Sequence, residues 1–518
     1  MQFPERSSLS ARAIMVLGTT SGAGKSWLAT ALCRWYARQG LKVAPFKAQN
    51  MSNNARVVPG PEGGPGEIGS AQYFQALAAR TVPDVRMNPV LLKPEKDTAS
   101  QVVVLGRVRD DYSAMPWRSR SELLWPHARE ALASLMADND LVVIEGAGSP
   151  AEINLHASDF VNMRTALAAR AHCLLVTDID RGGAFAHLFG TWQLLPEAER
   201  SLIKGFVLNR FRGDASLLAP GPQRLEDMTG VPTLAVLPMW RGHGLPEEDG
   251  VFDDAPTGPA AGHGLPRERI LRVAVVAYPR ISNLDEFQPL RSAPGVRLIW
   301  ARHPAQLNDV DCVILPGSKH TTSDLAWLRQ QELDAAIGAH AARGGAVLGV
   351  CGGLQMLGHA LEDPFGVETA EKHSVPGLGL LALRTHFAPD KLLCATSARF
   401  ADARAMGAPM DRGGNGLSWH ALAGVAVGGY EIRHGRTEAL STDAQPVLHD
   451  GQGQCLGWRQ GAVLGVYLHG MFESDAVLRA LLGAGAPSLD RVMDGLADFV
   501  DQHFEPGALL RLLERPSR

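Results

Sequence analysis

The chain has little cysteine for its length, no long hydrophobic run and almost no net charge. Its six cysteines are scattered over 518 residues without a C-x-x-C pair, so neither a zinc site nor a disulfide framework is indicated. No run reaches the roughly 18 apolar residues that a membrane-spanning helix needs. A charge of −4 with dispersed basic residues argues against binding nucleic acid through its phosphates. We therefore expect a cytoplasmic protein that binds neither nucleic acid nor a membrane.

The composition is that of a globular protein with several cores. Hydrophobic residues make up 45% of the chain and charged residues 20%, which is ample for two or three domains. Apolar strand-like runs alternate with helical stretches in both halves, and this pattern is typical of α/β folds with parallel sheets. Between the two halves, the chain becomes rich in Gly, Pro and Ala. We expect an N-terminal domain over residues 1–250, a linker over 251–268 and a C-terminal domain over 269–518. Within the last of these, residues 401–429 are glycine-rich and are expected to form a loop.

A glycine-rich segment near the N-terminus has the pattern of a phosphate-binding loop. It reads GTTSGAGKS over residues 18–26, between an apolar run at 13–17 and a helical pattern at 27–38. Strand, loop and helix in that order are the context that such a loop requires. Its first glycine lies one residue further from the lysine than in the strict G-x-x-x-x-G-K-[ST] form. The alternative is a glycine-rich turn with a lysine by chance.

The residue types in this loop suit a bound nucleotide phosphate. Backbone N–H groups and the start of a helix bind phosphate well, and we assign that role to the loop backbone at Gly22 and Gly24. Lys25 is expected to contact the β- and γ-phosphate oxygens. Ser26 is expected to be a ligand of Mg²⁺.

Polar residues of the N-terminal half gather where its apolar runs end. Glu145, Asp178, Asp180 and Asn209 all lie at or just beyond such an end. Ligands of open α/β sheets bind beyond the carboxyl ends of the strands, so we expect these residues near the phosphate loop. Glu145 is a candidate to act on Mg²⁺, directly or through water, or else a solvated loop acid. Asn209 is a candidate to contact the adenine of the nucleotide, or only a turn former.

One cysteine of the C-terminal half stands in the setting of a nucleophile. Cys351 ends an apolar run in the string LGVCGGLQ. Its neighbouring glycines allow a sharp turn that projects a reactive atom between a strand and a helix. The alternative is a buried structural cysteine. A thiol with a pKa of about 8.5 needs a base near neutral pH, and His469, which follows another apolar run, is the candidate base or else a histidine of the surface.

Attack by Cys351 would create an oxyanion that needs two backbone N–H donors. The string LPGSK at residues 315–319 follows a further apolar run and can direct an N–H toward the same end of the sheet. We assign the oxyanion hole to Gly317 and Gly352. Such a site would form and hydrolyse a thioester, releasing an amine or ammonia from an amide.

These motifs together resemble known families. The elbow, the PGS loop and the late histidine resemble the class I glutamine amidotransferases, and the N-terminal half resembles the dethiobiotin-synthetase-type ATPases. Their combination resembles the cobyric acid synthase family of the cobalamin pathway over nearly the whole chain. The strings that carry this resemblance are KAQNMSNN at 47–54, EIGSAQ at 67–72, MNPVLLKP at 87–94, DIDRGG at 178–183 and GYEI at 429–432.

The resemblance implies an ATP- and glutamine-dependent amidation of the b, d, e and g carboxylates of adenosylcobyrinic acid a,c-diamide, giving adenosylcobyric acid. ATP and Mg²⁺ would convert each carboxylate to an acyl phosphate, and ammonia released at Cys351 would displace the phosphate. The expected ligands are the corrinoid acid, L-glutamine and ATP. Lys47, Lys93 and Arg107 are either contacts of this acidic substrate or members of a solvated face. The oligomeric state is not indicated.

One feature departs from the class I pattern. Triads of that class usually place a glutamate two residues after the histidine, where this chain has Met471. We therefore expect a dyad of Cys351 and His469, and Glu431 and Glu473 are open candidates for a third group.

Three other functions remain open at this point. The first is the sister enzyme cobyrinic acid a,c-diamide synthase, which differs in substrate. The second is an amide ligase for a cell-wall precursor, a class that usually lacks the phosphate-loop half. The third is a non-enzymatic P-loop regulatory ATPase with a vestigial amidotransferase domain, for which replacing Cys351 would leave function intact.

Overall fold

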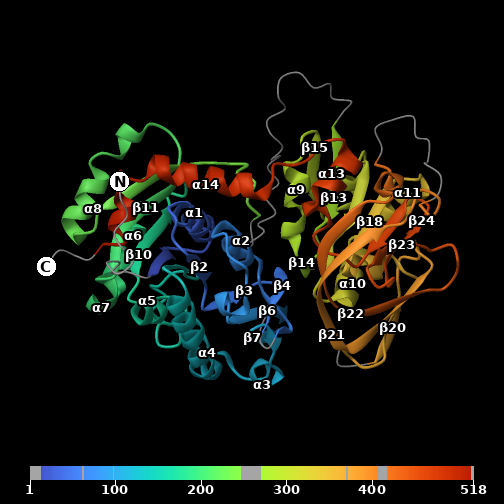
Figure 1. Cartoon of the computed structure of the whole chain (residues 1–518), viewed down its shortest axis with the longest axis horizontal. Coiled ribbons are helices and arrows are strands. Elements are labelled where there is room, and N and C mark those ends of the chain that lie inside the picture. Colours follow the sequence, from blue (N-terminus) through green and yellow to red (C-terminus); the bar gives the residue numbers. More distant parts are fainter. Residues whose placement is uncertain are drawn as a thin grey trace. The chain divides into compact units, whose positions relative to one another are not determined.

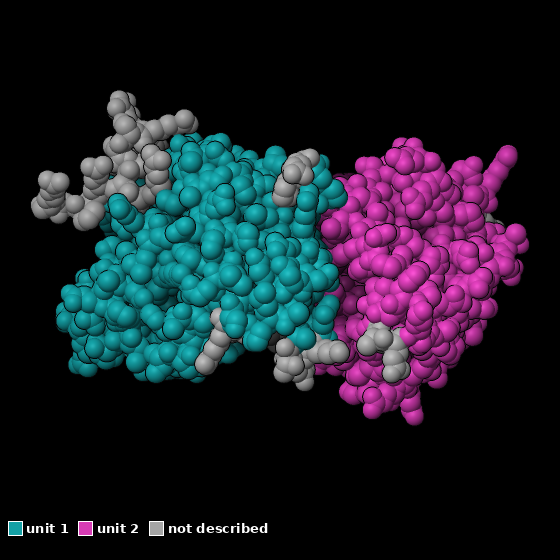
Figure 2. Space-filling model, turned by 90° about the horizontal axis from the view of Figure 1, so that it is seen from below, with its two compact units in different colours: residues 1–52, 58–249, 489–518 teal, residues 53–57, 250–488 magenta. Residues whose placement is uncertain are grey.

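The computed structural model describes residues 13–60, 63–96, 99–246, 270–368, 372–406 and 417–514. The chain divides into two compact units, which Figure 1 traces along the sequence and Figure 2 colours separately. Unit 1 consists of Met1–Ser52, Val58–Asp249 and Leu489–Arg518, and unit 2 of Asn53–Val57 and Gly250–Ser488. Across the described residues, every helix is too short or too polar to cross a lipid bilayer.

Unit 1 is built on a six-stranded parallel sheet in the order β12-β11-β10-β1-β9-β2. Parallel strands need crossover connections, which cover both faces of the sheet with helices. The strands of this sheet are β1 (Ala13–Gly18), β2 (Val43–Phe46), β9 (Leu141–Glu145), β10 (His172–Asp178), β11 (Ile203–Phe211) and β12 (Thr233–Pro238). The expected parallel α/β architecture is confirmed.

Alternate residues of the central strand β1 enter two different cores, as the period of a strand requires. Met15 and Leu17 pack into the core formed with α4, α5 and α6, whereas Ile14 and Val16 pack into the core formed with α1, α2 and α14. The helices of unit 1 are α1 (Lys25–Arg38), α2 (Ser70–Ala78), α3 (Asp110–Ser113), α4 (Trp117–Asp138), α5 (Met163–Ala169), α6 (Ala184–Leu194), α7 (Glu197–Arg200), α8 (Gly221–Thr229), α14 (Leu489–His503) and α15 (Ala508–Arg511).

The C-terminal segment Leu489–Arg518 belongs to unit 1, which differs from the expected boundary of the C-terminal domain. Helix α14 has one apolar face with helical spacing, and it packs against α1 (Figure 1). That face consists of Met493, Leu496, Ala497 and Val500. Arg34 of α1 is fully buried and pairs with Asp490 and, at 2.8 Å, with Asp494. A buried guanidinium needs such partners, so these contacts attach the segment to unit 1.

Two smaller sheets complete this half of the sequence. One has the order β3-β6-β7-β8 and the other pairs β4 with β5. Their strands are β3 (Gln49–Met51), β4 (Ala55–Pro59), β5 (Pro65–Gly69), β6 (Val90–Lys96), β7 (Ala99–Val104) and β8 (Arg107–Val108). The short segment Asn53–Val57, which includes the start of β4, belongs to unit 2 although its chain neighbours on both sides belong to unit 1. The expected linker at 251–268 lies outside the described residues.

Unit 2 contains an eleven-stranded mixed sheet. Its parallel part has the order β15-β13-β16-β18-β25, and antiparallel strands continue it from β24 through β23 to β21. Strand β21 also pairs with β22 and with β19, and β19 pairs with β20. A separate two-stranded pair joins β14 and β17. The strands of unit 2 are β13 (Leu271–Val276), β14 (Ile281–Ser282), β15 (Val296–Ala301), β16 (Cys312–Leu315), β17 (Gly317–Ser318), β18 (Ala346–Val350), β19 (Ala360–Asp363), β20 (His373–Pro376), β21 (Leu383–Phe400), β22 (Ala426–Ala439), β23 (Gln445–Asp450), β24 (Cys455–Gln460) and β25 (Val463–Val466).

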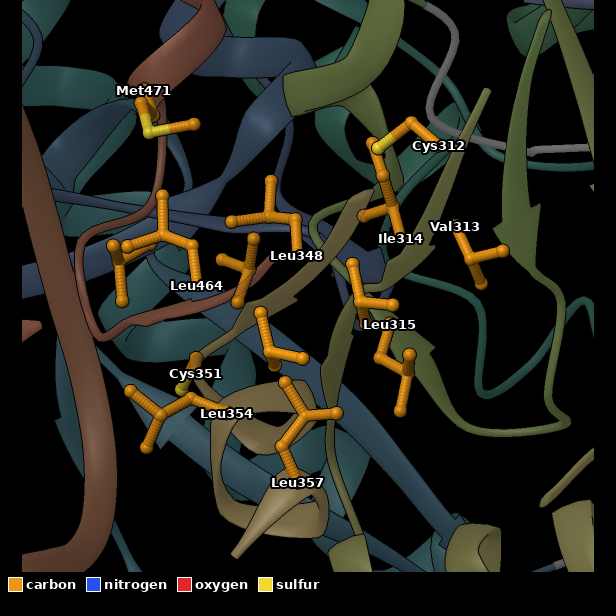
Figure 3. Close-up of a cluster of buried hydrophobic side chains, with 14 of the residues drawn as sticks. Cys312, Val313, Ile314, Leu315, Leu348, Cys351, Leu354, Leu357, Leu464 and Met471 are labelled. Carbon is orange, nitrogen blue, oxygen red and sulfur yellow. The ribbon is translucent and has the colours of Figure 1, made fainter. Parts of the chain in front are cut away.

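Short helices flank this sheet. They are α9 (Gln288–Ser292), α10 (Thr321–Gln330), α11 (Leu333–Ala342), α12 (Gly352–Leu357), α13 (Asp475–Leu482), and the 3₁₀ helices η6 (Leu284–Phe287), η7 (Pro304–Leu307), η8 (Trp419–Leu422) and η9 (Met471–Glu473). Part of the segment expected to be a loop at 401–429 forms η8 and the start of β22, and residues 407–416 lie outside the described residues. Figure 3 shows a part of the core of unit 2, in which Cys351 lies between Leu348 of β18 and Leu354 of α12.

Candidate functional site

Cys351 occupies a sharp turn between a strand and a helix. It directly follows β18 and precedes α12, and its φ of 49° lies in the left-handed region that side chains other than glycine rarely adopt. Its N–H donates to the Val466 carbonyl at 2.8 Å, and the residue is 6% exposed. Backbone strain of this kind concentrates at functional sites. The turn therefore has the geometry of a nucleophile elbow.

The glycines after Cys351 allow close packing of the elbow. A Cβ atom on Gly353 would lie 1.9 Å from the Leu315 carbonyl oxygen, and one on Gly352 would lie 2.8 Å from the Ser318 nitrogen. Both positions must therefore be glycine for α12 to pack on the chain that joins β16 to β17. This contact places Gly352 directly against the PGS loop.

His469 lies beside the Cys351 thiol and is 1% exposed. Burial lowers the pKa of His469, but the charge of Glu286, followed by the charge of Cys351 and hydrogen bonds with both groups, raises that pKa to about 10. A Cβ atom on Gly317 would lie 2.8 Å from Cε1 of the imidazole. The structure thus brings Cys351, His469, Gly317 and Gly352 together, as expected from the sequence.

The carboxylate that holds His469 is Glu286, which the sequence analysis missed. Nδ1 of His469 donates to Oε1 of Glu286 at 2.9 Å, and the N–H of Gly470 donates to Oε2 at 2.9 Å. Glu286 lies in η6 and is 1% exposed. Such a carboxylate orients the imidazole and stabilises its charged form.

The two carboxylates considered for this third position have other partners. Glu431 pairs with Arg433 at 2.7 Å, and Glu473 pairs with Arg56 at 2.6 Å. Both candidates named from the sequence are therefore wrong. The third residue is Glu286, which extends the expected dyad of Cys351 and His469 to a triad. A signal for it was present, because Asp285 and Glu286 form an acidic pair shortly after β13, at the sheet edge where ligands of α/β domains bind.

A thiol, an imidazole and a carboxylate in this order can perform nucleophilic catalysis. The raised pKa of His469 favours the imidazolium, which is the state left after the histidine has taken the thiol proton. The resulting thiolate is the reactive form of cysteine. This arrangement is suited to attack on a carbonyl carbon and to proton donation to the leaving group.

The phosphate loop of unit 1 has the expected strand–loop–helix context between β1 and α1. Gly22 and Gly24 have φ values of 71° and 101°, which glycine adopts without strain. Nζ of Lys25 donates to the carbonyls of Thr20 and Gly148 at 2.9 and 3.0 Å. These contacts hold the ammonium group at the loop, where phosphate oxygens of a nucleotide bind.

Ser26 and Glu145 meet at this loop. Oγ of Ser26 donates to Oε1 of Glu145 at 2.8 Å, and the same oxygen pairs with Nζ of Lys47 at 2.8 Å. Nε2 of Gln75 donates to the other oxygen at 2.5 Å. Burial raises the pKa of Glu145, but Lys47 and the hydrogen bonds outweigh this effect and lower it. A hydroxyl beside an ionised carboxylate is a donor set that fits Mg²⁺ together with nucleotide phosphates.

Asn209 lies under the phosphate loop. Its Nδ2 donates to the Ala23 carbonyl at 2.9 Å, and its Oδ1 accepts from the N–H of Arg210 at 2.9 Å. A Cβ atom on Gly24 would lie 2.1 Å from Nδ2, so the loop closes on this side chain. These contacts make Asn209 a support of the loop, and its expected contact with adenine stays a prediction.

The acidic residues at the end of β10 and two of the three expected substrate cations form ion pairs. Asp178 pairs with Arg210 at 3.0 Å, and Asp180 pairs with Arg212. Lys93 is buried and pairs with Glu67 at 2.5 Å. Like Lys47, Lys93 thus belongs to a buried pair rather than to a solvated face, whereas Arg107 is exposed.

Two family models match the chain, one over the half with the phosphate loop and the other over the half with Cys351. Residues 14–241 match the CobQ/CobB/MinD/ParA nucleotide binding domain, and residues 272–477 match the CobB/CobQ-like glutamine amidotransferase domain. The fold and the site therefore define an enzyme in which a glutamine amidotransferase domain follows a P-loop nucleotide-binding domain. The expected fold class is confirmed.

Relatives over the full length narrow this class further. The cobyric acid synthase of Methylibium petroleiphilum is 68% identical over 507 residues, which are 97% of this chain and 97% of the relative. The cobyric acid synthase of Leptothrix cholodnii is 67% identical, with 97% of both chains covered. That of Variovorax paradoxus is 63% identical over 98% of this chain and 100% of the relative. This chain belongs to the cobyric acid synthase family.

Proposed function

We propose that this chain amidates the b, d, e and g carboxylates of adenosylcobyrinic acid a,c-diamide with ATP and glutamine, giving adenosylcobyric acid. The observation that carries the proposal is that this chain, which matches a cobyric acid synthase over 97% of its length, contains both a Cys–His–Glu elbow and a phosphate loop. The relatives reported above are all named cobyric acid synthase. Their name favours the proposed reaction over that of an a,c-diamide synthase, a cell-wall ligase or a regulatory ATPase.

Ammonia would be produced at the Cys–His–Glu site. The sulfur of Cys351 attacks the side-chain amide carbon of glutamine after His469 has taken the thiol proton. The oxyanion receives hydrogen bonds from the backbone N–H groups assigned to Gly317 and Gly352. His469 then gives its proton to the departing nitrogen, and ammonia leaves behind a thioester. Water, deprotonated by His469, hydrolyses that thioester and releases glutamate.

Glu286 has two functions in this cycle. Its hydrogen bond to Nδ1 directs the other ring nitrogen, Nε2, toward the thiol, and its charge stabilises the imidazolium formed in each half of the reaction. The N–H of Gly470 holds the second carboxylate oxygen, so the carboxylate itself cannot rotate freely. The acid thus replaces the glutamate that class I enzymes usually carry two residues after the histidine.

Activation of the corrinoid carboxylate would take place at the phosphate loop. The loop backbone and Lys25 hold the phosphates of ATP in position for transfer to a carboxylate oxygen. Ser26 and Glu145 would hold Mg²⁺, which when bound neutralises charge on the phosphate oxygens. Ammonia then displaces phosphate from the acyl phosphate and forms the amide. Water would destroy this intermediate, and we infer that ammonia reaches it without first mixing with the bulk solvent.

Mass spectrometry of the corrinoid tests this function directly. Adenosylcobyrinic acid a,c-diamide is incubated with the chain, glutamine and Mg-ATP, and each carboxyl-to-amide step lowers the mass by about one unit. Four successive losses support the proposal, and an unchanged corrinoid contradicts it. A parallel reaction with unamidated cobyrinic acid that stops after two losses would indicate the a,c-diamide synthase instead.

A further inference from the structure

A segment from the N-terminal part of the sequence contacts the turn that carries Glu286. Asn53–Val57 belongs to unit 2, and within it Asn54, Ala55 and Arg56 are buried. The N–H of Ala55 donates to Oδ1 of Asn283 at 2.9 Å, and Oδ1 of Asn54 accepts from the N–H of Leu284 at 3.1 Å. These bonds fix the two residues that begin the turn.

Arg56 binds two carboxylates that flank Glu286 in the fold. It is 2% exposed and pairs with the buried Asp285, with Nε 3.1 Å from Oδ2, and with Oε1 of Glu473 at 2.6 Å. Asp285 precedes Glu286 in the chain, and Glu473 ends the 3₁₀ helix η9 that follows His469 and Gly470. One guanidinium therefore connects the chain before the catalytic carboxylate to the chain after the catalytic imidazole.

Arg56 also reaches the imidazole through an aromatic ring. Its guanidinium carbon lies 5.0 Å from the centroid of Tyr430, a distance at which a cation is attracted by the ring. Tyr430 in turn stacks on the imidazole of His469, with centroids 5.3 Å apart and planes inclined by 19°. Backbone hydrogen bonds of 2.9 and 3.2 Å join Tyr430 and His469. The ring of His469 is thus held between Tyr430 and Glu286.

Arg56 offsets part of an excess of negative charge at this place. Asp285, Glu286 and Glu473 carry three negative charges in a largely buried region, and Arg56 and a protonated His469 supply two positive ones. Without Arg56, the buried Asp285 loses its guanidinium partner beside Glu286. A buried carboxylate without a partner is unfavourable, and the turn is expected to rearrange to relieve it.

We propose that Arg56 is a positioning residue of the glutaminase site. By pairing with Asp285 and Glu473 it leaves Glu286 as the carboxylate that binds His469, and through Tyr430 it fixes the plane of the imidazole. This proposal rests on the proposed function of the Cys–His–Glu site. It makes the segment Asn53–Val57, which lies in sequence between stretches of the nucleotide-binding unit, a part of the glutamine-hydrolysing machinery.

The test replaces Arg56 by methionine in the full-length chain and measures two reactions. Release of glutamate from glutamine is expected to fall at least about tenfold in kcat, because small displacements of catalytic groups cost one to two orders of magnitude. The KM for glutamine is expected to stay within about twofold, since Arg56 acts on His469 rather than on substrate. Amidation of the corrinoid at high ammonium, which bypasses the glutaminase, is expected to stay unchanged.

Charge-balanced variants separate positioning from a general loss of folding. The triple variant R56M/D285N/E473Q removes the cation and both carboxylate charges, and is expected to recover most of the lost kcat. R56K, which keeps the charge, is expected to lie between wild type and R56M. Arg384→Met is the matched control, because Arg384 forms an exposed ion pair with Glu438 in the same unit.

Each outcome decides a different question. Wild-type glutaminase kcat in R56M overturns the positioning role, and so does a triple variant that keeps ammonium-dependent amidation but recovers no glutaminase. If R56M loses the ammonium-dependent reaction as well, R56K and the triple variant are measured in its place. The proposal is overturned if, in both of these variants, glutamine hydrolysis and ammonium-dependent amidation fall to the same extent. Absence of glutamine hydrolysis in the wild-type chain would instead contradict the proposed function itself.

Discussion

Glu286 offers the sharpest test of the active site, because the glutamate expected from the class I pattern is absent. Glu286→Gln keeps the size of the side chain and an oxygen that accepts from Nδ1 of His469, but it removes the negative charge. The variant therefore removes the charge beside the imidazole, together with the hydrogen bond that Oε2 accepts from the N–H of Gly470.

The magnitude follows from the pKa of His469. Burial lowers this pKa, and Glu286 is the largest of the effects that raise it from 6.5 to about 10. A rise of that size corresponds to roughly 5 kcal/mol in favour of the imidazolium. The removal of Glu286 is therefore expected to cost on the order of 2 to 3 kcal/mol wherever His469 is protonated in the reaction. The kcat for glutamine is then expected to fall by about 100-fold.

The assay compares glutamine-dependent with ammonium-dependent amidation of the corrinoid. Only the first is expected to fall in Glu286→Gln, because ammonium enters after the Cys–His step. Glu438→Gln serves as a control, since Glu438 is an exposed residue of the same unit that pairs with Arg384 at 3.0 Å. A glutamine-dependent kcat within about threefold of wild type would refute the assignment of Glu286 to the site.

Four further predictions follow from the sites. Cys351→Ser is expected to abolish glutamine use while amidation at high ammonium, followed by mass spectrometry, persists. Lys25→Ala is expected to lower amidation from either nitrogen source by about 100-fold or more, measured against basal glutamate release, which remains. The stabilising effect of the raised pKa of His469 is complete below pH 6.5 and is lost as the pH rises through about 10. The melting temperatures of wild type and Glu286→Gln are therefore expected to differ more at pH 6 than at pH 10. Labelled ammonium added with unlabelled glutamine should enter the product poorly, and full competition would contradict protected transfer of ammonia.

The parts of the sites that depend on local sequence could be predicted. The phosphate loop, the elbow at Cys351 and the carboxylate at the end of β9 each follow a buried strand, and a strand end in an α/β sheet has a known position relative to ligands. The residues on either side of a motif therefore determined its local geometry.

The parts that depend on distant contacts could not be predicted. Glu286 lies 183 residues before His469, and no spacing rule joins the two, because their meeting is set by the packing of η6 against η9, the 3₁₀ helix that follows His469 and Gly470. For the same reason, no local pattern predicts that the C-terminal helix α14 covers α1. Asn209 lies near the phosphate loop, as expected. Its contact with Ala23 could not be predicted, because it depends on Gly24 having no Cβ atom at the place that the amide of Asn209 occupies.

The return of Leu489–Arg518 to unit 1 affects how the protein is synthesised and folded. Almost all of unit 2 is translated between two pieces of unit 1, so the glutaminase can fold while the nucleotide-binding unit still lacks α14. Until that helix is made, the apolar surface of α1 and the buried Arg34 remain without their cover. During translation, the nucleotide-binding unit is thus completed only after unit 2, although its first strand leaves the ribosome before unit 2.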